Sequence, residues 1–233
     1  HQRNHFGDKN NRQLAGNSTG LQVTTKSRSL CEDCATCKAR RHTVTARSNN
    51  PRPDAPSELI SLDHCGPIKT TGIGGYKYIL RARCVATNFV CSLPARTCTA
   101  AETIALTETI KQRYIQHGHR IGTFITDGHL CFASTNGSSP DSSSAWEQWC
   151  TRHDIAFEHT PPYAHDQNPV EKDHQTLNSD LRCHMRSSKF PAMLWPLLLG
   201  GCDVLRNTEC VRERINMTAH EATTGNLPDP YHH

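Results

Sequence analysis

The chain has 233 residues, enough for one α/β domain of ordinary size with a small additional unit. Its longest apolar run, residues 192–201, is too short to span a bilayer and contains a proline. No segment resembles a signal peptide, so the composition excludes a typical membrane protein and we expect a soluble one. Because the chain begins with His1 and not with Met, we also expect a processed piece of a longer polypeptide.

The net charge of +4 is unevenly distributed along the chain. Residues 1–56 contain 10 Lys and Arg against 4 Asp and Glu, whereas the remainder contains 16 against 18. A basic N-terminal segment followed by a nearly neutral remainder favours a polyanionic partner, most simply nucleic acid. An ordinary solvated surface is the alternative interpretation.

The first half of the chain divides into a polar unit, a linker and three strands. Residues 1–45 form the first unit, and the Pro-rich residues 46–57 have no apolar period, which is typical of a linker. The following apolar, aromatic and β-branched segments predict strands at 58–67, 76–86 and 89–95.

Helical and strand patterns alternate in the rest of the chain. Leu106, Ile110 and Tyr114 recur at helical spacing and Gly118 follows as a stop, so we expect a helix at 99–118. Further expectations are strands at 120–129 and 155–159, a loop at 135–144, and helices at 145–153, at 168–187 and from Trp195 onward. Val170, Leu177 and Leu181 should lie on the buried side of the helix at 168–187.

These elements predict an α/β domain with a mixed five-stranded sheet. The predicted domains are 1–45, a linker at 46–57, a core at 58–187, and a C-terminal helix and tail of that core at 188–233.

Twelve cysteines would suggest disulfides in a short secreted chain. Only Cys31, Cys34 and Cys37 cluster, and the other nine are scattered through strand-like and helix-like segments. This distribution favours a reducing compartment, with the nine as small core residues.

The cluster predicts a zinc site in the first unit. His1 and His5 are separated by three residues, and Cys31 and Cys34 by two. Two imidazoles and two thiolates at these spacings close a tetrahedral Zn²⁺ site, which a unit with so few apolar residues needs in order to fold. The alternative is two exposed histidines beside a redox CxxC pair, and Cys37 is a spare thiol or a replacement ligand.

Three carboxylates form a second candidate constellation: Asp63 in a strand-like run, Asp127 after a later strand, and Glu171 at the start of a helix. A carboxylate inside an apolar strand is costly unless it is paired or binds a metal. Each also has an ordinary structural interpretation: Asp63 a strand-end turn, Asp127 a turn residue before Gly128, and Glu171 a helix cap. Asn168 is a suitable N-cap for that helix, and Pro169 suits its first position.

The motifs, taken in order, resemble those of the integrases of copia-type LTR retrotransposons, within the retroviral integrase superfamily. "HQRNH" and "CEDCATCKARR" are similar to the zinc-binding stretch. "LDHCGPI", "TDGHLCF" and "PPYAHDQNPVEK" resemble the three DDE motifs, and "FPAMLWPLLLGGCDVLRN" and "MTAHEATTGNLPDP" resemble the helix and tail that end the core. Among the departures from the family pattern, Cys37 stands in place of a Gly before Lys38, and Pro169 in place of a Gly; none removes a carboxylate.

This resemblance implies an RNase H-like sheet flanked by helices and preceded by a small helical zinc unit. It implies that Asp63, Asp127 and Glu171 bind two Mg²⁺ (or Mn²⁺) ions for phosphoryl transfer, in which one ion activates the attacking oxygen and the other stabilises the leaving oxygen. The expected reactions are trimming of the element's DNA ends and strand transfer into target DNA, performed by a homo-multimer. The expected location is the nucleus, with a cytoplasmic virus-like particle stage. We expect Glu171 to be a ligand and Asn168 to cap the helix without its help.

Basic and polar residues are candidates for gripping DNA phosphates. On the long helix, Lys172 flanks Glu171, and His174, Asn178 and Arg182 follow on about the same face, so that either DNA contact or a solvated helix face is expected. Lys38, Arg40 and Arg41 are further candidates in the first unit. His64 should point to the side of its strand opposite Asp63, as a packed or surface residue.

Two alternatives to an active integrase remain at this point. The first is a catalytically decayed remnant that binds nucleic acid without turnover. The second is an unrelated RNase H-like nuclease, which explains the carboxylates but not the His/Cys unit in front of them.

Overall fold

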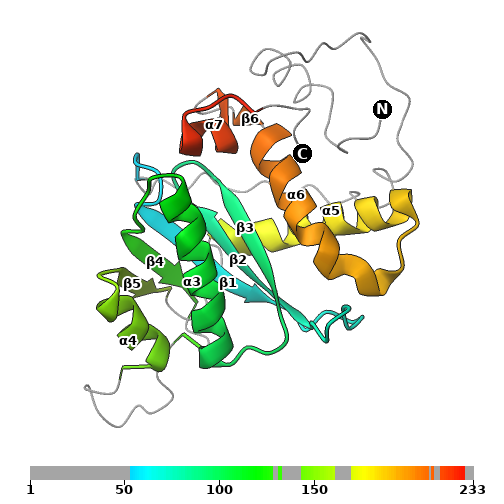
Figure 1. Cartoon of the computed structure of the whole chain (residues 1–233), viewed down its shortest axis with the longest axis horizontal. Coiled ribbons are helices and arrows are strands. Elements are labelled where there is room, and N and C mark those ends of the chain that lie inside the picture. Colours follow the sequence, from blue (N-terminus) through cyan, green and yellow to red (C-terminus); the bar gives the residue numbers. More distant parts are fainter. Residues whose placement is uncertain are drawn as a thin grey trace.

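The computed structural model describes residues 53–127, 131–132, 143–160, 169–209, 211–212 and 216–228, with the side chains of 169, 171, 172 and 212 left out. Five strands form the central sheet (Figure 1). They are β1 (Leu59–Cys65), β2 (Tyr78–Cys84), β3 (Val90–Ala95), β4 (Thr123–Thr126) and β5 (Ala156–His159).

The sheet is mixed, in the order β3-β2-β1-β4-β5. β1, β2 and β3 form an antiparallel meander, whereas β4 and β5 run parallel to β1. Antiparallel neighbours can be joined by short turns, but a parallel pair needs a crossover, which α3 (Ala100–Gln116) supplies between β3 and β4. The predicted mixed five-stranded α/β sheet is confirmed.

The first face of the sheet carries α3 and α4 (Ala145–Arg152). Both helices begin at a side-chain cap: Thr99 accepts from the Glu102 N–H, and Ser144 and Glu147 form a capping box. Alternate strand residues pack beneath them in one core that includes Ile60, Leu62, Leu80 and Trp146. The period-2 alternation of the strands therefore directs their apolar residues to this face.

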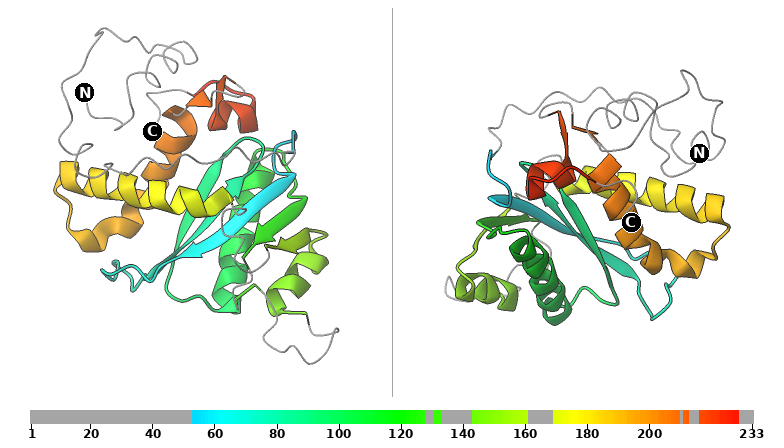
Figure 2. Two further views of the ribbon diagram at one scale, coloured as in Figure 1. Left: turned by 180° about the vertical axis from the view of Figure 1, so that it is seen from behind. Right: turned by 45° about the horizontal axis from the view of Figure 1, so that its top comes forward.

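The opposite face carries α5 (Pro169–Ser188) and α6 (Trp195–Glu209) (Figure 2). The short 3₁₀ turn η2 (Ala192–Leu194) lies between them and directly precedes α6. A second, smaller apolar cluster forms there from Ile79, Leu177, Leu181, Trp195, Leu199 and Cys202. The predicted buried side of the long helix is confirmed, because Val170, Leu177 and Leu181 are all buried. The chain continues in the two-stranded pair β6 (Val211–Arg212) and β7 (Met217–Thr218) and the helix α7 (Ala219–Thr224), which contacts α6.

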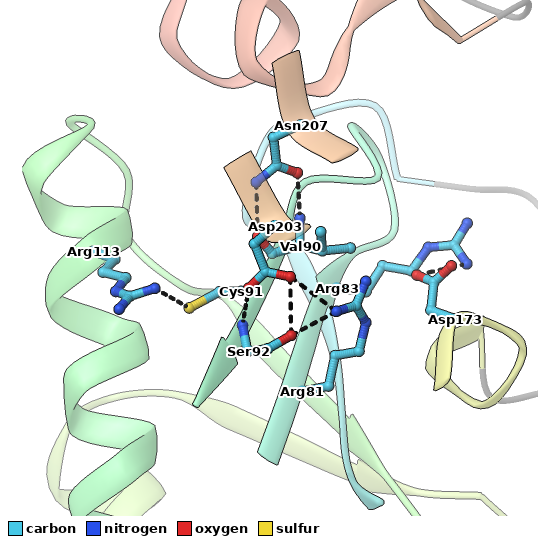
Figure 3. Close-up of polar contacts among 9 residues, drawn as sticks. All are labelled: Arg81, Arg83, Val90, Cys91, Ser92, Arg113, Asp173, Asp203 and Asn207. Carbon is cyan, nitrogen blue, oxygen red and sulfur yellow. Dashed lines mark hydrogen bonds and ion pairs between the residues drawn. The ribbon is translucent and has the colours of Figure 1, made fainter. Parts of the chain in front are cut away.

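A buried polar network joins α6 to the sheet (Figure 3). Arg81 of β2 is 1% exposed and donates to Asp203 of α6 at 3.0 Å and to Ser92 of β3 at 2.5 Å. Asn207 of α6 accepts from the Val90 N–H at 2.9 Å and donates to the Val90 carbonyl at 2.8 Å. Because β3 is an edge strand, α6 satisfies backbone groups that would otherwise lack partners.

The cysteines that the structure describes form no disulfide. Cys84, Cys91, Cys131, Cys150, Cys183 and Cys202 are buried, as expected for small core residues, while Cys65 and Cys98 are partly buried. Among the described residues, no helix is long and apolar enough to cross a membrane.

Candidate active site

Asp63 and Asp127 come together because β1 and β4 are parallel neighbours. Leu62 pairs with Thr126, and each aspartate follows its paired residue by one position. Neighbouring strands lie roughly 4.8 Å apart, so the backbones of the two aspartates meet at the same level of the sheet. Asp63 lies within β1, so its interpretation as a strand-end turn is wrong. The structure thus brings the backbone positions of two of the three predicted carboxylates next to each other on neighbouring strands.

Asp63 faces α5, where it contacts His174. The two side chains are 14% and 9% exposed, and His174 Nε2 lies 3.1 Å from Asp63 Oδ2. Burial lowers the pKa of His174, but its contacts with Asp63 and then with Cys65 outweigh this and raise the pKa to about 9. His174 is therefore positively charged at neutral pH and forms an ion pair with Asp63.

Cys65 lies on the same side of β1, two residues after Asp63. The Asn178 amide of α5 donates to its sulfur at 3.7 Å. Burial raises the pKa of the Cys65 thiol, but contacts with His174 and Asn178 outweigh it, so that the pKa lies below its ordinary value. The polar environment of Asp63 thus extends along β1 toward its end.

The third predicted carboxylate belongs to the first turn of α5. The Val170 N–H donates to Ser61 Oγ at 3.3 Å, which places the start of the helix beside β1. Glu171 is the next residue, and its side chain lies outside the described part of the structure. Its prediction as a ligand, and the prediction that Asn168 caps the helix, therefore remain predictions.

A second ion pair ties α5 to the sheet. Arg83 of β2 lies 3.2 Å from Asp173 of α5, with side chains 16% and 9% exposed (Figure 3). Arg83 also donates to Asn88 in the turn between β2 and β3. Arg81 and Arg83 are not among the residues predicted from the sequence, although their alternation with Leu80 and Ala82 indicates that both face the α5 and α6 side.

A hydrogen-bonded chain leads from α4 to the residue before Asp127. His159 Nδ1 lies 2.8 Å from Thr126 Oγ1, and His159 Nε2 lies 3.0 Å from Glu147 Oε1. Glu147 is also part of the capping box of α4. Side chains from β5 and α4 therefore fix the end of β4, and no pattern in the sequence predicted these contacts.

The predicted nucleic-acid contacts fall in different environments. Arg182 is exposed, Asn178 is partly buried against Cys65, and the Lys172 side chain is outside the described residues. His174 points into the protein, and the whole residue is only 7% exposed. Neither a DNA contact nor a solvent-exposed position, the two alternatives expected from the sequence, fits this burial. The sheet therefore covers the face of α5 that carries His174, and this face becomes exposed only further along the helix, at Arg182.

His64 behaves as predicted. It points to the α3 face, where Nε2 lies 3.0 Å from Thr103 Oγ1. The centre of its ring lies 5.7 Å from that of the Phe132 ring, with the two planes tilted by 35°. The zinc ligands predicted at His1, His5, Cys31 and Cys34 lie outside the described residues, as do Lys38, Arg40 and Arg41.

Within the part of the chain that the structure describes, no three His, Cys, Asp or Glu side chains are close enough together to hold a metal ion. The described residues nevertheless fit part of a Mg²⁺ site, because carboxylates supply the hard oxygen ligands that Mg²⁺ prefers. His174 occupies Oδ2 of Asp63, and Oδ1 has no hydrogen-bond partner among the described residues. One carboxylate oxygen thus remains for a cation.

The sequence matches no known family model and no curated protein. The structure is similar to the catalytic core domain of BIV integrase, with 20% identity and a TM-score of 0.52 over 72% of this chain and 93% of that one. It is also similar to the simian T-cell lymphotropic virus intasome in complex with the PP2A regulatory subunit B56 gamma. There the identity is 17% and the TM-score 0.61, over 87% of this chain and 67% of that one. At these identities the likeness establishes the fold, an α/β mixed sheet of the integrase-core type.

Proposed function

We propose that this chain is the integrase of a copia-type LTR retrotransposon, a DDE-type polynucleotidyl transferase. The observation that carries the proposal is the parallel register of β1 and β4, which brings Asp63 beside Asp127. The fold likeness to integrase cores and the order of the sequence motifs support it. Its reactions are trimming of the element's DNA ends and their transfer into target DNA.

In this proposal Asp63, Asp127 and Glu171 hold two Mg²⁺ or Mn²⁺ ions. When bound, such ions activate the attacking oxygen and stabilise the leaving oxygen of an in-line phosphoryl transfer. The start of α5 beside Ser61 supports the third ligand, because it brings helix position 171 to the strand that carries Asp63. His174, in the next turn of the same helix, lies 3.1 Å from Asp63 Oδ2.

The proposed DNA contacts are Lys172, Asn178 and Arg182 on α5 and Lys38, Arg40 and Arg41 in the first unit. The exposure of Arg182 supports its role, since phosphate contacts need a side chain that reaches the surface. A homo-multimer acting on two DNA ends, in the nucleus after a cytoplasmic virus-like particle stage, completes the proposal. The neighbouring simian viral structure is itself an intasome.

A strand-transfer assay on element-end DNA with Mg²⁺ or Mn²⁺ tests the activity. The wild-type chain should join labelled ends to target DNA, whereas Asp127→Asn should be inactive because it loses a charged metal ligand. Equal background for the two proteins would contradict catalysis and favour a decayed, nucleic-acid-binding remnant. Metal-dependent cleavage of RNA–DNA hybrids without any joining would instead favour an unrelated nuclease.

We further propose that His1, His5, Cys31 and Cys34 bind one structural Zn²⁺. The spacing of the two pairs supports this site. Purified protein should contain one zinc per chain by elemental analysis, and the double variant Cys31→Ser, Cys34→Ser should contain none. Retention of zinc by that variant would show that these cysteines are not ligands; Cys37→Ser is the matched control.

A further inference from the structure

Three polar contacts join one face of α5 to one face of β1, and we propose that the central one, from His174 to Asp63, positions the active site. In this role His174 orients the Asp63 carboxylate. It also sets the axial position of α5 relative to β1, and this position determines where residue 171 of the helix lies. His174 is a positioning residue and not a ligand. The inference rests on the proposed function and adds a device for assembling its metal site.

The contacts follow a matched spacing along the helix and the strand. They join Val170 to Ser61, His174 to Asp63 and Asn178 to Cys65. Four residues of helix advance about 6 Å, and two residues of strand advance about 6.6 Å, so successive partners stay in step. A slip of α5 by a single residue would rotate this face by about 100° and break the two side-chain contacts, from His174 and Asn178. The three contacts together therefore define one axial register.

The central contact is the strongest of the three. A thiol is a weak acceptor, and the contact from Val170 to Ser61 joins two neutral groups. The contact from His174 ends on a carboxylate, and hydrogen bonds to ionised groups are shorter and stronger than those between neutral groups. It also holds Oδ2 alone, which leaves Oδ1 turned away from the imidazole and available to a cation.

Other interactions already hold α5 on the sheet. Asp173 pairs with Arg83, and Leu177 and Leu181 are buried in the second apolar cluster. Replacing His174 by a side chain of similar volume should therefore leave the fold intact. What should change is the placement of Asp63 relative to the first turn of α5.

The test compares two nearly isosteric substitutions, His174→Gln, whose amide can donate to Asp63, and His174→Met, which cannot. Mn²⁺ binding to the full chain, without DNA, is measured by electron paramagnetic resonance. We expect His174→Met to weaken Mn²⁺ binding by about 10- to 100-fold, as is usual for the loss of a group that orients a metal ligand. His174→Gln should restore most of the affinity, and Gln175→Ala, at the exposed neighbouring position, should bind like the wild type.

Equal Mn²⁺ affinities for the Gln and Met variants would overturn the positioning role. A Met variant that fails to fold, judged by circular dichroism, would also overturn it, because His174 would then hold the helix itself. Asp63→Asn separates this inference from the proposed function. If Asp63→Asn binds Mn²⁺ as tightly as the wild type, the proposed metal site fails and the inference with it; if it loses binding while Met and Gln match, only the inference fails.

Discussion

At the scale of single residues, the charged groups on the α5 and α6 face of the sheet have partners from distant parts of the chain. Asp63 is paired with His174, Arg83 with Asp173, and Arg81 with Asp203. Burial raises the pKa of Asp203 above its ordinary value, although the Arg81 guanidinium 3.0 Å away opposes this. A buried charge of this kind is tolerated only while its partner is present.

Removing one partner should therefore cost more than removing both charges. Asp203→Asn leaves the Arg81 charge buried and unpaired, and it should lower the free energy of unfolding by about 3–5 kcal/mol. The double variant Arg81→Met, Asp203→Asn should recover part of this loss, because it also removes the unpaired Arg81 charge, while the amide oxygen at 203 still accepts from the Ser92 N–H. Urea unfolding followed by circular dichroism measures both.

The partly exposed pair of Lys111 and Glu108, whose side chains are 12% and 36% exposed, is the comparison for that experiment. Glu108→Gln should change the free energy of unfolding by at most about 1 kcal/mol, since solvent reaches the Glu108 carboxylate and screens the pair. If the double variant were as unstable as Asp203→Asn alone, an unpaired charge would not be the cause of the loss.

At the scale of elements, the loop between β1 and β2 is locked to the connection between α5 and α6. Trp195 Nε1 donates to the Thr70 carbonyl at 3.0 Å, and the Ile73 N–H donates to the Met193 carbonyl at 2.7 Å. Gly72 lies so close to Pro196 that a Cβ added there would stand 2.4 Å from Pro196 Cγ. This contact explains why a residue without a side chain occupies the loop at that point.

Two glycine-to-alanine substitutions should consequently have opposite effects on stability. Gly72→Ala should destabilise the protein by about 1–3 kcal/mol, because the added methyl group forces the loop away from the start of α6. Gly201→Ala should stabilise it by about 0.4–1 kcal/mol, since Gly201 is exposed within α6 and an added Cβ meets no atom within 4 Å. Thermal unfolding compares the two, and a Gly72→Ala variant as stable as the wild type would contradict the steric role of the contact with Pro196.

At the scale of the whole molecule, the sheet depends on a helix that follows it in sequence. The predicted boundary between a core at 58–187 and a tail at 188–233 separates β2 and β3 from α6. Yet α6 supplies Asp203 to Arg81, Asn207 to the edge strand, and Trp195 and Leu199 to the second apolar cluster. We infer that the region after 188 is needed for the fold of the region before it.

Truncation tests this dependence. A chain that ends at residue 188 should be insoluble or partly unfolded, because it leaves the Arg81 charge unpaired and one face of the sheet exposed. A chain that ends at residue 228 retains α6 and α7 and should unfold cooperatively like the full chain. Gel filtration and urea unfolding compare the two, and a cooperatively folded monomer ending at 188 would contradict the dependence.

The sequence by itself determined the five strands of the central sheet, the helices that flank it and the direction in which most of their side chains point. Alternation within 58–67 places Asp63 on the face opposite Ile60 and Leu62, and helical spacing places Leu177 and Leu181 on a buried side, as the structure shows. Both patterns are local, because backbone geometry sets the periods of strands and helices. The family resemblance implied an α/β fold with a mixed sheet, and the structure is similar in fold to the catalytic core domain of BIV integrase.

Only the tertiary structure decided which charged groups meet. Sequence spacing left three ordinary explanations open for the carboxylates, whereas the pairing of β1 with β4 brings Asp63 beside Asp127. The packing of α5 on the sheet also turned His174 inward onto Asp63, whereas the sequence predicted that this face of the helix lies at the surface. The physical reason is that periodicity states which face of its own element a residue occupies, but a contact also requires the register between two elements, and that is set by packing across the whole chain.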